Sequence, residues 1–60
     1  MKIEVGKTYL FCIRTSNRDL TFTGLVLTLE EGFISFKDKL NVIKNYNLNS
    51  IISFEEVEND

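Results

Sequence analysis

The sequence lacks histidine, proline and tryptophan, and it contains a single cysteine. Without histidine, Ser-His-Asp and Cys-His catalysis and most zinc sites are excluded, and a single cysteine excludes an intrachain disulfide. The longest wholly apolar run, Tyr9 to Ile13, is far shorter than the ~20 residues of a membrane-spanning helix. Residues 1–5 do not have the order of a signal peptide. We therefore expect a cytoplasmic protein that is not an enzyme and holds no metal or cofactor.

The length of 60 residues allows one domain, residues 1–60, with a small core. A chain of this size buries only about 60% of the surface of its unfolded state, so a lone monomer is marginally stable. With no disulfide and no metal, association with a partner is the remaining source of stability. The net charge is −2: residues 55–60 carry four acidic groups, and the first 54 residues have a net charge of +2. We interpret this acidic end as a solvated, fraying terminus.

The segment Leu20–Glu30 is predicted to form one long, strongly bent strand. Its eleven residues make it about twice as long as a typical strand. Leu20 and Phe22 share one face, whereas the leucines of residues 25–29 take the other, which a regular strand cannot do. Gly24 lies at the changeover, and a glycine inside a strand often marks a bulge or a sharp bend. The strand should therefore belong to two sheets in turn.

Four further strands are predicted, with short turns between them. They span Thr8 to Thr15, Phe33 to Asp38, Val42 to Asn47 and Ile51 to Val57. Turns connect the first four strands, with Gly32 at a left-handed position, and residues 47–50 suit a single 3-10 turn. The expected fold is all-β: a small, strongly bent barrel of five antiparallel strands with one 3-10 turn before the last strand.

Three segments of this pattern resemble Sm-like and Src-homology-type small barrels. They are Gly6-Lys7-Thr8-Tyr9-Leu10 at the start of a strand, Phe22-Thr23-Gly24-Leu25-Val26 at the bend, and Ile51-Ile52-Ser53-Phe54 after a short turn. The resemblance covers about residues 5 to 57. It implies the barrel architecture, which hosts many unrelated functions.

The residues with which these two families bind their ligands are not matched in this sequence. Glu30 stands where the first Sm motif has Asp, but Phe33 or Ile34 stands at its Asn, and neither reads a base edge. The basic residue of the second motif is missing from residues 48–51. Src-homology domains hold Pro-rich peptides with surface aromatics that include Trp, which is absent here. The resemblance therefore implies the fold, and neither uridine-rich RNA nor polyproline as the ligand.

Four apolar residues indicate a surface that meets another chain. Leu40 lies in a turn, where Gly, Asn or Asp is usual, so its side chain should be exposed unless a partner covers it. Two unbroken apolar runs place apolar groups on both faces of their strands, although a half-solvated sheet should alternate. The candidate protein contacts are Leu40, Leu25, Leu27 and Tyr9. The leading hypothesis is a non-enzymatic interaction or assembly module that self-associates or binds another protein.

The alternative hypothesis is an Sm-like binder of single-stranded nucleic acid, RNA or DNA. Basic residues near an aromatic side chain form the simplest platform for single strands. Lys37 and Lys39 share a parity, and Lys44 is expected to face them across the turn. The full candidate set is Arg14, Arg18, Lys37, Lys39, Lys44 and Tyr46. The competing interpretation is an ordinary solvated hairpin whose lysines discourage edge pairing.

The remaining reactive groups have structural interpretations. Cys12 lies between two apolar residues of a strand and is expected to be a buried thiol. The pairs Glu30-Glu31 and Glu55-Glu56 are adjacent in strands and point to opposite faces, so we interpret them as solvated charges. A small phage or mobile-element protein that modulates a host complex is a third hypothesis, which no residue favours.

Overall fold

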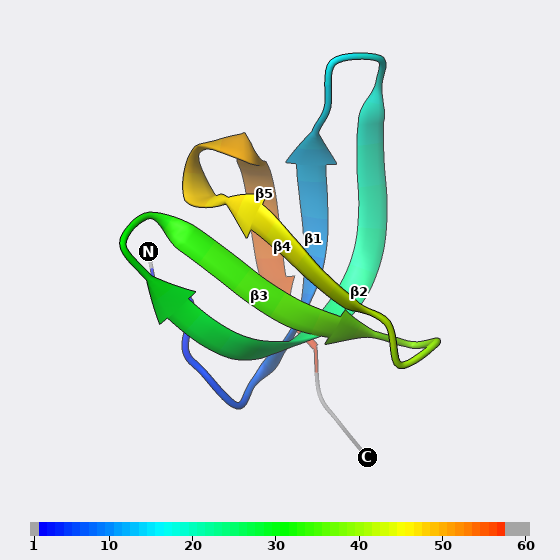
Figure 1. Cartoon of the computed structure of the whole chain (residues 1–60). Coiled ribbons are helices and arrows are strands. Elements are labelled where there is room, and N and C mark those ends of the chain that lie inside the picture. Colours follow the sequence, from blue (N-terminus) through cyan, green and yellow to red (C-terminus); the bar gives the residue numbers. More distant parts are fainter. Residues whose placement is uncertain (1, 58–60) are drawn as a thin grey trace.

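The computed structural model describes residues 2–57, which form five strands and one 3-10 turn (Figure 1). The elements are β1 (Thr8–Arg14), β2 (Asp19–Glu30), β3 (Phe33–Asp38), β4 (Ile43–Asn47), the 3-10 turn η1 (Leu48–Ser50) and β5 (Ile51–Glu56). The all-β class, the five strands and the 3-10 turn before the last strand are therefore confirmed, with element ends that differ from the prediction by one residue at most. None of the described residues belongs to a helix that is long and apolar enough to cross a membrane.

The strands form one antiparallel sheet in the order β4-β3-β2-β1-β5. The first four strands follow one another as a meander, and the chain then returns through η1 to place β5 beside β1 (Figure 1). Within residues 2–57 no ladder joins β4 to β5, so the sheet curls around the core and stays open. The strong bend is confirmed, and β4 and β5 are both edge strands.

The bend lies in β2, which pairs with β1 through its first part and with β3 through its second part (Figure 1). The two pairings overlap at Gly24 and Leu25, and the register against β3 then shifts around Leu27, which is a bulged residue. A bulge changes the face of the residues after it, so Leu29 packs on the core whereas Leu25 lies outside. The prediction that Gly24 marks the change of face is therefore wrong, because alternation alone cannot show which residue is unpaired.

Gly24 is needed instead for a close approach between β2 and Phe36 of β3. The glycine is buried, and a Cβ atom at this position would lie 2.7 Å from Cδ1 of Phe36. Carbon atoms do not approach so closely without displacing one another. The missing side chain lets the Phe36 ring pack directly against the backbone of the bent strand.

The core lies on the inner face of the curled sheet and is built around aromatic rings. The rings of Phe11 and Phe36 stack with their centroids 5.1 Å apart. Phe22 and Tyr46 pack against Phe36 with centroid distances of 5.1 and 5.8 Å. The buried apolar residues are Tyr9, Phe11, Ile13, Val26, Ile34 and Phe36. These residues come from β1, β2 and β3, so the three central strands are held together by one cluster.

Alternation along β1 places Cys12 on the outer face, between the inward residues Phe11 and Ile13. Its side chain is half-buried, and its neighbours across the sheet are Thr21 and Ser53. The prediction of a thiol buried in the core is therefore wrong. The apolar neighbours in the sequence point to the other side of the strand.

The N-terminal residues 2–7 run alongside β2 and contribute to the core. The Gly6 N–H donates to the Val26 carbonyl at 2.9 Å, and the Val26 N–H donates to the Lys7 carbonyl at 3.0 Å. Ile3 packs against the core cluster. This segment therefore covers part of the opening that the unclosed sheet leaves.

The acidic end is ordered as far as it is described. Glu55 and Glu56 belong to β5, opposite Leu10 and Tyr9 of β1, so the predicted fraying is wrong for these two residues. Pairing with β1 holds their backbone, while their side chains stay exposed. Glu4 and Glu56 lie beside the Lys7 ammonium, and they raise the pKa of Lys7 above its ordinary value. Residues 58–60 lie outside the described residues.

Candidate functional site

The turn between β3 and β4 presents Leu40, whose side chain is 81% exposed. The Asp38 N–H donates to the Val42 carbonyl, and the Asn41 N–H donates to the Asp38 carbonyl, both at 3.0 Å. Asn41 has a φ of 63°, a left-handed conformation that asparagine tolerates well. The predicted exposure of Leu40 is confirmed. It stands at the tip of a hydrogen-bonded three-residue loop.

The carboxylate of Asp38 organises this turn. Its Oδ1 accepts hydrogen bonds from the backbone N–H groups of Leu40 at 2.8 Å and of Val42 at 3.0 Å. Its Oδ2 lies 3.5 Å from Nζ of Lys44. The Val42 and Leu40 N–H groups and the Lys44 charge hold the pKa of Asp38 below its ordinary value, against the opposing effect of desolvation. Leu40 is therefore carried by a preorganised turn.

Exposed apolar side chains are concentrated at this end of the hairpin. Val42 and Ile43 are exposed as well as Leu40, so three large apolar residues lie within residues 40–43. In the rest of the described chain no four-residue stretch has more than one. Scattered apolar residues are normal on a protein surface, and residues 40–43 depart from that pattern among the described residues.

Two adjoining hollows run along the outer side of the sheet next to the turn. One is bordered by Leu40 together with Leu10 of β1, and the other by Leu25 of β2 together with Lys37. Thr23, Asp38 and Lys39 border both. The predicted contact residues Leu40 and Leu25 therefore lie along one side of the molecule. Leu27, the bulged residue, is half-buried and borders neither hollow.

Tyr9 does not belong to this surface, because its side chain is only 2% exposed. Its ring packs against Phe11 and Phe54, each with a centroid distance of 5.7 Å. Its hydroxyl oxygen accepts a hydrogen bond from the Glu4 N–H at 2.8 Å. The prediction of Tyr9 as a contact residue is therefore wrong. The outward apolar residue of β1 is Leu10, which alternation identifies once Phe11 is known to point inward.

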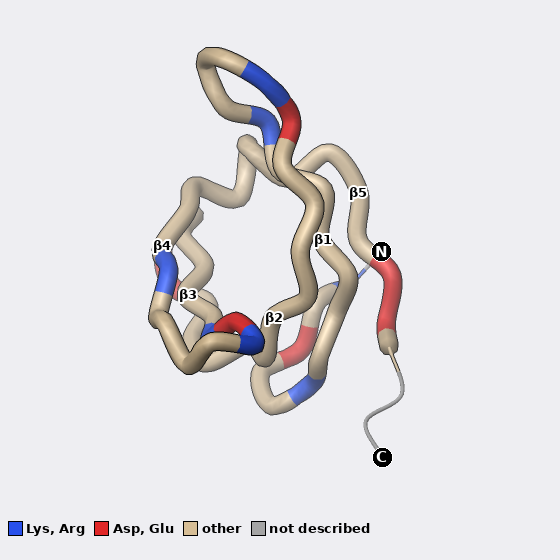
Figure 2. The backbone as a smooth tube through the Cα atoms, turned by 90° about the vertical axis from the view of Figure 1, so that its right-hand side faces the viewer, with Lys and Arg blue, Asp and Glu red and all other residues tan. Residues whose placement is uncertain are grey.

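The basic residues predicted to bind nucleic acid do not form one platform. Arg14 and Arg18 lie at the β1–β2 turn, well apart from the lysines of the β3–β4 hairpin (Figure 2). Lys44 pairs with the buried Phe36 and so lies on the inner side of the hairpin, whereas Lys37 lies on the outer side. The prediction that Lys44 faces the other two lysines across the turn is therefore wrong.

Lys44 and Tyr46 are engaged within the hairpin. Nζ of Lys44 lies 5.1 Å from the centroid of the Phe22 ring, in a cation–π contact, and also beside Asp38. Tyr46 stacks on Phe36 and on Phe22. The Lys44 charge and the Tyr46 ring, which a nucleotide would need, are therefore already engaged within the protein. Lys37 and Lys39 are the two predicted basic residues that border the outer hollows.

Both edge strands present unpaired backbone groups. The bonds from Asp38 N–H to the Val42 carbonyl and from Leu48 N–H to the Gly32 carbonyl show which residues of β4 bond to β3. In an antiparallel pair, the residues between them direct their N–H and C=O groups away from the partner strand. In the same way, the bond from Val57 N–H to the Thr8 carbonyl shows which residues of β5 bond to β1. The outward-directed residues are Ile43, Asn45 and Asn47 in β4 and Phe54 and Glu56 in β5.

Comparison of the chain with protein-family models, with curated proteins and with solved structures gives no match. The resemblance to Sm-like and Src-homology barrels therefore stays a prediction. Among residues 2–57 no three His, Cys, Asp or Glu side chains are grouped so that they could hold a metal ion.

Proposed function

We propose that this chain is a non-enzymatic protein-interaction module that assembles with copies of itself through the β3–β4 turn. The observation that carries the proposal is the 81% exposed side chain of Leu40 on a turn held by two hydrogen bonds to Asp38. Burying a leucine side chain contributes about 1.5–3 kcal/mol. Because the turn is already ordered, little of this gain is lost to conformational entropy on binding.

Two further features favour self-association. The edges of β4 and β5 are open, and edge strands with unpaired backbone groups readily join other chains. The chain carries seven basic and nine acidic side chains, a net charge of only −2, so repulsion between copies is weak. A small chain also gains stability from mass action when it binds a partner.

The test is the solution mass of wild type and of Leu40→Asp, measured by sedimentation over a range of concentrations. Wild type should form oligomers. Leu40→Asp should be a folded monomer, because its carboxylate would have to be buried without a partner. Phe33→Asp is the matched control, since Phe33 is also largely exposed, at 56%, but lies at the far end of β3. A wild type that stays monomeric, or a Leu40→Asp variant of unchanged mass, contradicts the proposal.

Binding of single-stranded nucleic acid is a second candidate, favoured by one observation. Lys37 and Lys39 border the same hollow on the outer side of the sheet, where a phosphate backbone could approach both. This candidate lacks a free aromatic ring beside the lysines, because Tyr46 is stacked inside the hairpin. It therefore ranks below self-assembly.

A further inference from the structure

An apolar groove lies where the sheet fails to close. It is lined by Ile3 of the N-terminal segment, Leu29 of β2, Leu48 of η1, and Ile51, Ile52 and Phe54 of β5. Its volume is about 360 Å³, which is more than a leucine side chain needs. Ile52 is 44% exposed and is not part of the core cluster. The groove is therefore open to a partner.

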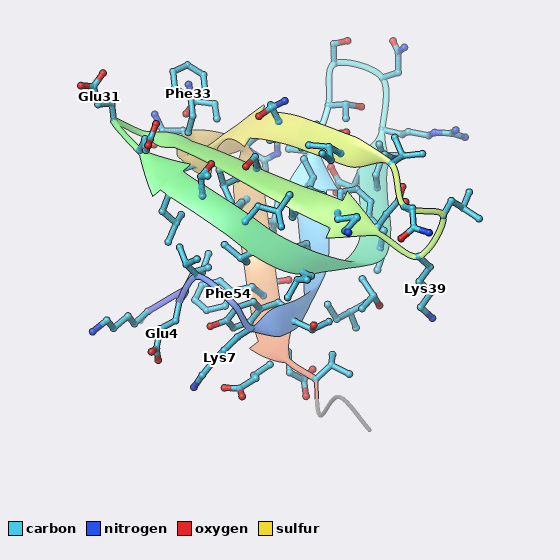
Figure 3. All side chains as sticks on the ribbon, turned by 60° about the horizontal axis from the view of Figure 1, so that its bottom comes forward. Glu4, Lys7, Glu31, Phe33, Lys39 and Phe54 are labelled. Carbon is cyan, nitrogen blue, oxygen red and sulfur yellow. The ribbon has the colours of Figure 1, made fainter. Side chains whose placement is uncertain are left out.

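The groove and Leu40 lie at different ends of the molecule. Leu29 is next to the β2–β3 turn, whereas Leu40 follows the other end of β3, about 20 Å away for six residues of strand. Figure 3 shows the same separation, with Lys39 at one end of the hairpin and Glu31 at the other. Leu40 therefore cannot reach the groove of its own chain, but it can reach the groove of another copy.

The charges around the two surfaces are complementary. Glu4, Glu30 and Glu55 are exposed and follow groove-lining residues in the sequence, so they lie at this end of the molecule. Glu30 and Glu55 point to the outer face of their strands, and Glu4 is paired with Lys7. Lys2, which also lines the groove, offsets one of these charges. At the other surface Lys39 precedes Leu40, and Lys37 lies nearby, while Asp38 is paired with Lys44. Opposite charges attract two copies in the orientation that brings the turn of one to the groove of the next.

We propose that Leu40 of one copy inserts into this groove of the next, so that copies associate head to tail. The inference rests on the proposed function, in which Leu40 mediates self-association, and adds the surface that receives it. Each copy uses two different surfaces, which makes the interface heterologous. Such contacts build rings when the rotation between copies closes, and open filaments when it does not.

The test mixes two variants that each lack one of the two surfaces. Leu40→Asp keeps the groove, and Ile52→Asp keeps the turn. Each variant alone should be a monomer, whereas the equimolar mixture should form a dimer and nothing larger, because only one good interface can form. The dissociation constant of this dimer should be at least about 100-fold lower than that of either variant alone, since each separate variant buries an unpaired carboxylate.

The possible results separate this inference from the proposed function. If Ile52→Asp assembles like wild type while Leu40→Asp does not, Leu40 mediates assembly but the groove does not receive it, and only the further inference fails. If wild type itself is monomeric, both fail. A mixture that remains monomeric also overturns the head-to-tail contact.

A crosslinking experiment keeps the inference testable if circular dichroism shows that Ile52→Asp does not fold. In a chain with Cys12→Ser, the single variants Leu40→Cys and Ile52→Cys are mixed and oxidised mildly. Cysteines at contacting positions should give a disulfide-linked dimer of the two variants. Leu40→Cys mixed with Asn17→Cys, in the exposed β1–β2 turn, is the control and should give none. Absence of the first crosslink overturns the proposed contact.

Discussion

At the scale of single residues, Phe36 connects the two halves of the bent sheet. Its ring contacts Phe11 of β1, Phe22 of β2 and Tyr46 of β4, and it is fully buried. Gly24 makes this position possible because it has no Cβ to meet the ring. A single glycine and a single phenylalanine therefore determine how closely the bend of β2 packs on β3.

Gly24→Ala should lower the free energy of unfolding by about 1–3 kcal/mol, the usual effect of overpacking a core. The new Cβ would lie 2.7 Å from Phe36 Cδ1, and the surrounding rings leave Phe36 little room to move. The clash should outweigh the ~0.4–1 kcal/mol that Gly→Ala gains by restricting the unfolded chain. Urea unfolding followed by circular dichroism measures the difference. Thr21→Ala, at an exposed position of the same strand, is the control, and equal stability of Gly24→Ala and wild type contradicts the argument.

Asp38 should make the fold less stable as the pH becomes acidic. The Val42 and Leu40 N–H groups and Lys44 lower its pKa in the folded state, so the ionised form stabilises the fold. This contribution is complete above the unfolded-state pKa and is lost as the pH falls through the folded-state pKa. The midpoint of thermal unfolding should therefore fall more steeply on acidification for wild type than for Asp38→Asn. Asparagine keeps an acceptor oxygen but does not titrate, so parallel profiles would contradict this role of Asp38.

At the level of elements, the open sheet leaves β4 and β5 with one free edge each. The backbone groups of Asn45 point away from β3, whereas those of Lys44 pair with Phe36. A free edge is a second route to self-association besides the turn and the groove. The two routes use different atoms, so they can be distinguished.

Asn45→Pro should leave both the fold and the assembly intact. Proline lacks an N–H, and the N–H of residue 45 is not used by the ladder with β3. Lys44→Pro is the matched comparison and should be destabilised by at least about 1–3 kcal/mol, because the Phe36 carbonyl loses its donor. Thermal unfolding and sedimentation of the two variants give the answer. A folded but monomeric Asn45→Pro would mean that copies join through the β4 edge and not through Leu40 in the groove.

For the whole molecule, charge separation is the main long-range feature. Basic residues gather at the β3–β4 hairpin and at the β1–β2 turn, each group with one acidic residue beside it (Figure 2). The other described acidic residues lie at the end of β5, at the β2–β3 turn and in the N-terminal segment. Self-assembly and nucleic-acid binding would both depend on this separation. They differ in which partner neutralises Lys37 and Lys39.

Lys37→Glu combined with Lys39→Glu should weaken assembly severalfold, because exposed charge pairs contribute about 0.2–1 kcal/mol each. The assembly of wild type should weaken with added salt for the same reason. Arg14→Glu with Arg18→Glu is the control and should assemble normally, since these residues lie at the other turn. Wild type should not shift a single-stranded oligonucleotide. A shift that the lysine variant abolishes, with assembly unchanged, would favour nucleic-acid binding instead.

The sequence by itself determines the strands and turns. β-Branched and aromatic runs, Gly32 in a left-handed turn and a short polar segment before the last strand predict the all-β fold, because these are local preferences of the backbone. The exposure of Leu40 follows from its place in a turn, so it can be predicted without knowing which strands pair.

Only the tertiary structure decides which face each side chain takes. The packing of β1 between β2 and β5 puts Tyr9 inside and Cys12 outside. The bulge at Leu27 puts Leu29 on the core, and the register of β3 against β4 puts Lys44 against Phe22. A shift of one residue exchanges the two faces of a strand, and packing of distant strands selects the register. The apolar groove likewise combines residues from both ends of the chain, with Ile3 near Phe54. Such a surface exists only after the sheet has curled, because no local pattern in the sequence specifies which strands fail to meet.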